Sequence, residues 1–178
     1  PYIEAVFGQI PSDDVRFIPF SIADQCQRGH NPIHIAIEYL LNLPHARLTA
    51  TEVMDLLDLE SIRRKFGLKE SDLPLLKRWV LGSGIRWGLD SHHRGSLDPG
   101  LNFEQNSWRF GLKRMALGYC MGEGATFENI APYADVGGIE ADRLGPLWHF
   151  VETLEIHQTL LSTRATPSIW GERLREMI

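Results

Sequence analysis

The chain has 178 residues, of which 43% are hydrophobic and 23% are charged, and its formal net charge at pH 7 is −5. This composition is typical of one soluble globular domain, or of two small ones that share a core. It argues against a dedicated nucleic-acid-binding domain, which is usually basic. The two cysteines are too few for a disulfide framework, so we expect free thiols and a cytoplasmic location. No stretch contains the roughly 18 consecutive apolar residues that a membrane-spanning helix needs.

Both ends of the sequence look cut. The first residue is Pro1, and apolar residues within Ser168–Ile178 predict a helix that runs into the last residue without a stop signal. We therefore expect a piece of a longer protein. The alternative is a complete protein with a processed start and a frayed end.

One strand or extended segment is predicted near the start of the chain. Val15–Ile22 is rich in β-branched and aromatic residues, but Pro19 restricts it to a sheet edge or to an extended segment. The rest of the chain is predicted to be mainly α-helical.

From residue 31 onward the apolar residues recur at helical spacing. Asn31 is placed to cap a helix whose first residue is Pro32, and Thr49 forms a capping box with Glu52. A further helix is predicted to open at Ser71 and to close at Gly82 and Gly84. The residues expected to share the inner faces of these helices are Ile33, Ile37, Leu40, Leu41, Val53, Met54, Leu56, Leu57, Leu73, Leu76 and Val80.

A long exposed loop is predicted over Asp90–Gln105, which is rich in Gly, Ser, Asp, Asn and Pro. It is a possible boundary between two helical subdomains within the single domain 1–178. His92 and His93 are expected to be solvated there.

The clearest helix begins at Trp108, and Gly122 and Gly124 end it. A long helical stretch follows Gly138, and Pro146 either kinks it or starts a second helix there. The residues expected on the inner faces of these two helices are Trp108, Leu112, Met115, Ala116, Tyr119, Leu144, Leu147, Trp148, Val151 and Leu154.

The common catalytic motifs are absent from the sequence. It contains no phosphate-binding P-loop, no His-Glu-x-x-His, no Gly-x-Ser-x-Gly and no Cys-x-x-Cys. Gly82-Ser-Gly84 and Gly122-Glu-Gly124 lack the third glycine of a dinucleotide-binding loop and indicate helix ends instead. We therefore expect no catalytic site, no cofactor and no small-molecule ligand.

Cys26, His30 and His34 are spaced four residues apart, which would suit metal ligands on one helix. Pro32 interrupts that helix and a fourth ligand is missing, so we expect no metal site.

The basic residues Arg109, Lys113 and Arg114 are the candidate site residues. Arg109 and Lys113 are like charges four residues apart, which is mildly unfavourable on a helix, and no acidic residue lies between Asn106 and Met121. The surface is expected to face something anionic: DNA phosphate, an acidic partner, or an acidic neighbouring helix. Arg63–Lys65 follows Asp58 and Glu60 and is expected to form a solvated, self-neutralising face.

Several stretches of the chain resemble RecC, the gamma chain of bacterial exodeoxyribonuclease V (RecBCD), in order over nearly the whole length. The most specific are GIRWGLD and SWRFGLKRM. The stretches are Pro1–Gly8, Arg16–Asp24, Ala46–Leu68, Leu73–Asp90, Asn106–Gly122 and Ala131–Leu147.

This resemblance implies a helical 2B-type insertion subdomain of a chain that is built like a superfamily-1 helicase but has lost its motor motifs. It also implies a non-catalytic scaffold that clasps RecB, guides DNA strands towards RecD, helps to split the duplex and reads the Chi sequence in double-strand break repair and recombination. DNA would be met through the parent complex. No Chi-reading residue is assigned in this segment. The sequence departs from the family pattern at Cys26–His30 and His92–Leu101, where we expect no shared function.

Two other functions stay open at this point. One is a free-standing helical protein–protein adaptor without a DNA role. The other is a small metal-dependent enzyme that uses Cys26, His30 and His34. Salt-dependent DNA binding would separate the adaptor from the scaffold, and zinc content would test the enzyme.

Overall fold

The computed structural model describes residues 6–7, 9–10, 14–18, 32–124 and 126–177, and the chain divides into two compact units, Pro1–Ile35 and Ala36–Ile178. In the described part of the first unit, Arg16 pairs with Asp14 at 2.8 Å around a turn. The described residues of the Val15–Ile22 prediction, 15–18, form a turn and a short irregular stretch rather than a strand. Residues 19–22 lie outside the described residues, as do Cys26, His30 and Asn31.

The described chain is mainly helical, as predicted, and its only strand-like feature is an isolated antiparallel bridge between Phe127 and Ile130. No helix of this described part is long and apolar enough to cross a membrane. In chain order, the α-helices (α) and 3₁₀ helices (η) are α2 (Pro32–Leu41), η2 (Leu43–His45), α3 (Ala50–Asp58), α4 (Glu60–Lys65), η3 (Glu70–Asp72), α5 (Leu73–Gly82), α6 (Ser91–Leu97), α7 (Trp108–Met121), η4 (Gly138–Arg143), α8 (Leu144–Ser162) and α9 (Pro167–Met177).

Local sequence signals explain where several helices begin and end. Thr49 and Glu52 form the predicted capping box of α3, with backbone-to-side-chain distances of 2.8 and 3.2 Å. Ser107 caps α7 by accepting a single hydrogen bond from the Phe110 N–H at 3.2 Å. Gly122 follows α7 with a φ of +67°, a conformation that favours glycine, and so ends the helix as predicted.

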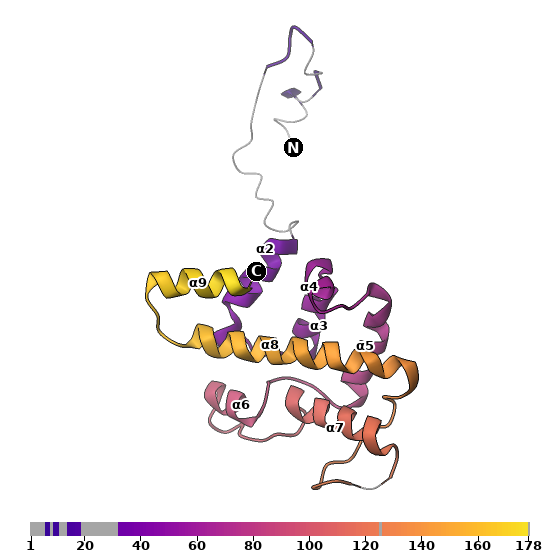
Figure 1. Ribbon diagram of the computed structural model, residues 1–178. Coiled ribbons are helices and arrows are strands. Elements are labelled where there is room, and N and C mark those ends of the chain that lie inside the picture. Colours follow the sequence, from indigo (N-terminus) through magenta and orange to yellow (C-terminus); the bar gives the residue numbers. More distant parts are fainter. Residues whose placement is uncertain (1–5, 8, 11–13, 19–31, 125, 178) are drawn as a thin grey trace. The chain divides into compact units, whose positions relative to one another are not determined.

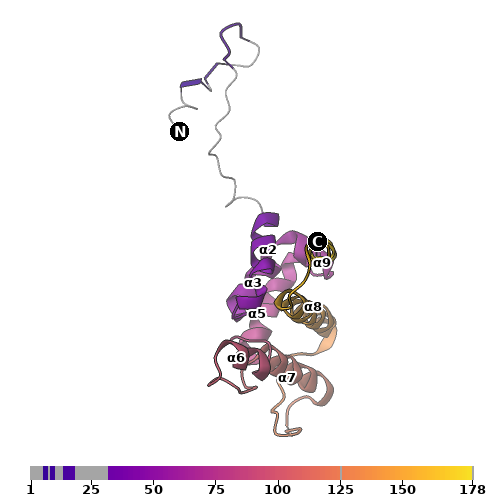
Figure 2. The same cartoon turned by 90° about the vertical axis from the view of Figure 1, so that its left-hand side faces the viewer.

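The core of the second unit lies around α8. Its buried side chains Leu147, Phe150, Val151 and Leu154 belong to one apolar cluster with residues of α3, α5 and α7. Figure 1 shows α3 and α4 on one side of α8 and α6 and α7 on the other, with α5 crossing behind α8. Figure 2, in which α8 is seen nearly along its axis, keeps α6 and α7 on that same side of it. The long helix therefore joins two groups of helices.

The predicted loop Asp90–Gln105 contains a helix. Asp90 accepts the His93 N–H at 2.8 Å and caps α6, whose residues His93 and Arg94 are 4% and 0% exposed. The expectation of a solvated histidine pair is therefore wrong for His93. The polar composition misled because these two polar side chains point into the core. A subdomain boundary in 90–105 stays a prediction.

Two helix faces also differ from expectation. Tyr119 of α7 is 59% exposed, and Gly118 is buried in its place, because the backbone of Tyr133 packs directly on the glycine. In α2, Ile33 and Leu41 are exposed. The first four residues of α2 belong to the first unit, and Ala36 is the buried residue of this helix. Pro146 lies in the first turn of α8 and thus marks its start.

Candidate functional site

The sequence-predicted site residues all lie on α7, where Arg109 contacts the long helix α8. One of its terminal nitrogens, Nη2, donates to both carboxylate oxygens of Glu155, at 2.6 and 2.7 Å. The hydrogen bond to Glu155 raises the pKa of Arg109. An acidic neighbouring helix is therefore the counter-charge for this arginine, which was one of the three alternatives.

Arg114 holds the backbone of two other segments. Its Nη1 donates to the Ser83 carbonyl at 2.6 Å, and its Nε donates to the Ala131 carbonyl at 2.8 Å. In addition, the Tyr133 N–H donates to the carbonyl of Arg114 itself at 2.9 Å. Arg114 thereby joins the end of α5 to the loop after α7.

Lys113 is the exposed member of the three. It lies at the edge of a shallow hollow of about 130 Å³ with Trp148, Glu152 and Glu155. It forms no ion pair within 4.0 Å among the described residues. The structure thus brings Arg109 and Lys113 to one surface facing α8 and places Arg114 in an internal role.

A buried arginine, which sequence analysis did not single out, organises the segment before α7. Arg94 is fully buried and donates to the carbonyl oxygens of Trp87, Phe103 and Gln105 at 2.6–3.2 Å. Its guanidinium also lies 4.7 Å from the ring centres of Trp87 and Phe103. Burial lowers the pKa of Arg94, and Glu104 opposes this effect. Carbonyl dipoles and aromatic faces stabilise the buried charge.

The surroundings of Arg94 explain why small and aromatic residues stand close to it. A side chain at Gly88, whose φ is +76°, would lie 2.8 Å from the Arg94 Cγ atom. Arg47 lies 4.5 Å from the Trp87 ring centre, so two guanidinium groups contact this indole. The sequence shows polar and aromatic residues in this segment, but this pattern does not indicate that Arg94 is buried.

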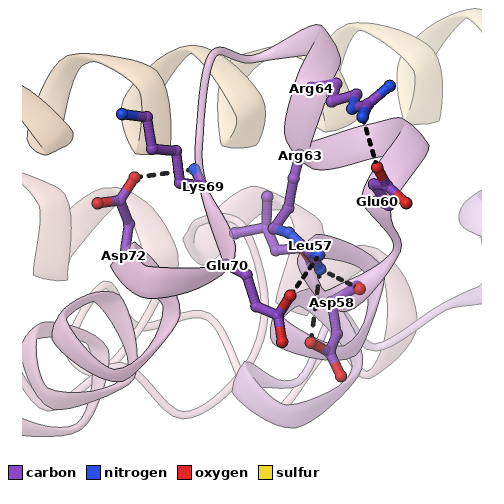
Figure 3. Close-up of polar contacts among 8 residues, drawn as sticks. All are labelled: Leu57, Asp58, Glu60, Arg63, Arg64, Lys69, Glu70 and Asp72. Carbon is purple, nitrogen blue, oxygen red and sulfur yellow. Dashed lines mark hydrogen bonds and ion pairs between the residues drawn. The ribbon is translucent and has the colours of Figure 1, made fainter.

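The Arg63–Lys65 cluster is self-neutralising, as predicted, but Arg63 is not solvated. Figure 3 shows its side chain directed towards Asp58 and Glu70, at 3.5 and 3.9 Å, and its Nη1 donates to the carbonyls of Leu57 and Asp58. Only 7% of Arg63 is exposed. Arg64 pairs with Glu60 at 2.8 Å on the surface. Arg63 therefore closes the turn between α3 and α4.

His93 is the buried titratable group of this region. Its Nδ1 accepts from the Leu89 N–H at 3.3 Å, whereas its Nε2 has no hydrogen bond that meets normal geometry with the described residues. Burial lowers the pKa of His93, although Asp90 and the nearby Ala46 carbonyl act in the opposite direction. The ring is therefore held in its neutral form.

No group of three or more His, Cys, Asp or Glu side chains is placed to hold a metal ion in the described ranges. His34 is exposed on α2, and the other two residues of the metal hypothesis lie outside those ranges.

A model of the family described as RecBCD enzyme subunit RecC fourth domain matches residues 30–178. The chain belongs to the RecC family. The RecBCD enzyme subunit RecC of Escherichia coli (strain K12) is 35% identical over all of this chain and 16% of its own length. The subunit of Haemophilus influenzae (strain ATCC 51907 / DSM 11121 / KW20 / Rd) is 36% identical over all of this chain and 15% of its length. That of Mycobacterium tuberculosis (strain ATCC 25618 / H37Rv) is 36% identical over 75% of this chain and 12% of its length.

The chain thus spans 16% or less of the length of each of these RecC relatives. The two stretches that resembled RecC most specifically, GIRWGLD and SWRFGLKRM, make internal contacts. Besides Trp87, Gly88, Arg109 and Arg114, described above, they include Trp108, whose Nε1 donates to the Leu48 carbonyl at 2.9 Å. These RecC-like stretches therefore hold α6, α7 and α8 together.

Proposed function

We propose that this chain is a non-catalytic, architectural domain of a RecC subunit. The observation that carries the proposal is the use of the polar groups in its two most RecC-like stretches. Asp90 and Ser107 cap helices, Arg109 binds Glu155, and Arg114 binds two backbone carbonyls. Side chains engaged in this way stabilise the domain and are not free to act on a substrate.

Through that subunit, we propose a role in the RecBCD complex during double-strand DNA break repair and recombination, with RecB and RecD as partners. Membership of the RecC family and the word RecBCD in the names of its relatives support this assignment. The mainly helical fold is compatible with a helical 2B-type insertion of a superfamily-1 helicase-like chain, which is the finer fold that we propose. DNA would be met within the complex.

A DNA or anion contact on α7 is part of the proposal, and among Arg109, Lys113 and Arg114 it falls to Lys113. Arg109 and Arg114 already have intramolecular partners, whereas Lys113 is exposed. One or two phosphate contacts would give a log–log salt slope of about −1 to −2. If Lys113→Ala leaves DNA binding and its salt dependence unchanged, this surface makes no DNA contact.

Two measurements test the main proposal. The purified chain should neither hydrolyse ATP nor cut DNA, and the full-length subunit should co-elute with RecB and RecD. An activity that persists through several columns and disappears on substitution of a residue within 36–178 contradicts the non-catalytic role. A full-length subunit that stays alone in the presence of both partners favours the free-standing adaptor.

A further inference from the structure

Helix α6 is attached to the core without an apolar anchor. The buried side chains of this helix are His93 and Arg94, which are 4% and 0% exposed. Its apolar residue Leu97 is 37% exposed. By contrast, α3 and α7 each bury several aliphatic or aromatic side chains. The attachment of α6 therefore depends on polar interactions, which respond to protonation in a way that apolar contacts do not.

His93 connects two backbone segments through opposite edges of its ring. Its Nδ1 accepts from the Leu89 N–H at 3.3 Å, so the neutral ring carries its proton on Nε2. The Nε2 atom faces the carbonyl of Ala46, which lies between η2 and α3. A neutral imidazole accepts at one nitrogen and donates at the other, whereas an imidazolium only donates. Protonation of His93 therefore removes the acceptor of the Leu89 N–H and leaves two N–H groups facing each other.

The charges on and next to α6 decide how this helix responds to a proton on His93. Burial lowers the pKa of His93, and Asp90 and the Ala46 carbonyl act in the opposite direction. The neighbours Arg94 and His92 lower this pKa as well. The guanidinium of Arg94 is fully buried and is bound by backbone carbonyl oxygens rather than by a carboxylate. A protonated His93 would be a second buried positive charge beside it, which is unfavourable unless the ring returns to water.

The titratable groups of the neighbouring elements are engaged or basic. His45 of η2 and Glu155 of α8 line the hollow of about 510 Å³ that His93 borders. Glu155 already binds Arg109 at 2.6 and 2.7 Å, and a protonated His45 would repel a protonated His93. Glu104, in the segment before α7, accepts from the hydroxyl of Ser91 at 2.9 Å and acts on the buried guanidinium of α6. Each of these carboxylates therefore already has a partner.

We propose that α6 is a pH-sensitive switch, in which protonation of His93 releases this helix from the core while α3, α7 and α8 stay folded. The switch is independent of the architectural role, so its absence would leave that role intact. Release brings the ring into water, where a histidine has its ordinary pKa near 6.5. The equilibrium constant for release should therefore rise as the pH falls below about 6.5, by at most about tenfold per pH unit, until the lower pKa of the attached state is reached. Release also withdraws Arg94 from the rings of Trp87 and Phe103.

Hydrogen–deuterium exchange of the full-length subunit, measured by mass spectrometry on peptides of α6 and α3, tests the switch. The quantity compared is the protection factor, in which the intrinsic pH dependence of amide exchange is divided out. Between pH 7.5 and 5.5 it should fall about three- to tenfold in α6 and stay within about twofold in α3. An equal fall in both peptides would mean that the whole domain unfolds, and an unchanged factor in α6 would mean that the helix stays attached. Either result overturns the inference.

His92 provides the matched control, because it precedes His93 on the same helix and is exposed. His92→Gln should keep the pH dependence of the α6 protection factor, whereas His93→Gln, which lacks the titrating ring, should abolish it. Loss of the pH dependence in His92→Gln, or its persistence in His93→Gln, overturns the inference. If His93→Gln leaves α6 unprotected at both pH values, this side chain holds the helix as proposed, and the comparison of the parent with His92→Gln still tests the role of its proton.

Discussion

Replacing Gly118 by alanine should destabilise the chain, although alanine is the better helix former. Gly118 is buried on α7, and a Cβ atom built there would lie 1.7 Å from the Tyr133 carbonyl oxygen and 2.4 Å from its carbonyl carbon. The obstructing atoms belong to the backbone and cannot rotate away. The segment that carries Tyr133 would have to move until this contact exceeds 3.0 Å.

The expected free energy follows from opposing effects. Alanine in place of glycine stabilises a helix by about 1 kcal/mol. Overpacking costs about 1–3 kcal/mol, and moving Tyr133 breaks the 2.9 Å hydrogen bond from its N–H to the Arg114 carbonyl, worth about 1 kcal/mol. The steric effect and the lost hydrogen bond outweigh the helix propensity, so Gly118→Ala should lower the free energy of unfolding by about 2 kcal/mol.

Gly145→Ala is the matched control, because a Cβ atom in the first turn of α8 would have no neighbour within 4 Å. This variant should gain up to about 1 kcal/mol. Urea unfolding followed by helical circular dichroism measures both effects as shifts of the midpoint at constant slope. If Gly118→Ala is as stable as the parent while Gly145→Ala gains, the close approach of Tyr133 is not a constraint and the reasoning is refuted.

Three further predictions concern the core, the α7–α8 ion pair and pH. Leu112→Ala should lower the free energy of unfolding by about 2–5 kcal/mol because Leu112 is 2% exposed. Tyr119→Ala should change it by no more than about 0.5 kcal/mol because Tyr119 is 59% exposed. Equal losses in urea unfolding would contradict the orientation of α7. Arg109→Ala should lower the free energy of unfolding by about 0.5–1 kcal/mol, and this loss should disappear in high salt because the partner Glu155 is partly exposed. Lys113→Ala should leave the free energy of unfolding unchanged. A larger loss for Lys113→Ala in the same salt series would reverse this assignment. Burial lowers the folded-state pKa of His93, so its contribution to stability should be complete above the unfolded pKa near 6.5. Stability should then fall as the pH decreases towards the lower folded pKa, with a slope of at most about 1.4 kcal/mol per pH unit. His93→Gln should reduce this slope between pH 7 and 5, and an unchanged slope would show that the ring is not held neutral.

Helices with an apolar stripe and a capping signal could be predicted from the sequence. The capping box of Thr49 and Glu52, the buried stripe of Trp108, Leu112 and Met115, and the stop at Gly122 depend on interactions within a few residues. Helix α6 could not be predicted in this way. Its core-facing residues include His93 and Arg94, which sequence patterns place on the surface. Burial of Arg94 depends on carbonyl groups and rings up to eleven residues away in the chain, and His93 lies beside the distant Ala46 carbonyl.

That Arg109 has an acidic neighbour could be expected from the sequence, but the contacts of the three basic residues could not, and a functional site at these residues stays a prediction. Like charges at Arg109 and Lys113 predicted a nearby counter-charge, and Glu155, 46 residues away, supplies one for Arg109. The Arg114 contacts depend on the folding of the Ala131–Tyr133 backbone against α7, which no local pattern specifies. The contact at Gly118 also explains why Tyr119 is exposed. It could not be predicted, because a glycine adds no hydrophobic residue to the pattern from which the buried face of a helix is inferred.

Assembly of the complete complex tests the architectural role most directly. Full-length subunits that carry Gly118→Ala or Gly145→Ala would be mixed with RecB and RecD, and native mass spectrometry would measure the fraction of each in the three-subunit complex. The proposed role predicts a lower assembled fraction for Gly118→Ala, a fraction equal to the parent for Gly145→Ala, and the same ATP hydrolysis per assembled complex in all three. Full assembly of Gly118→Ala with reduced ATP hydrolysis per complex would contradict it.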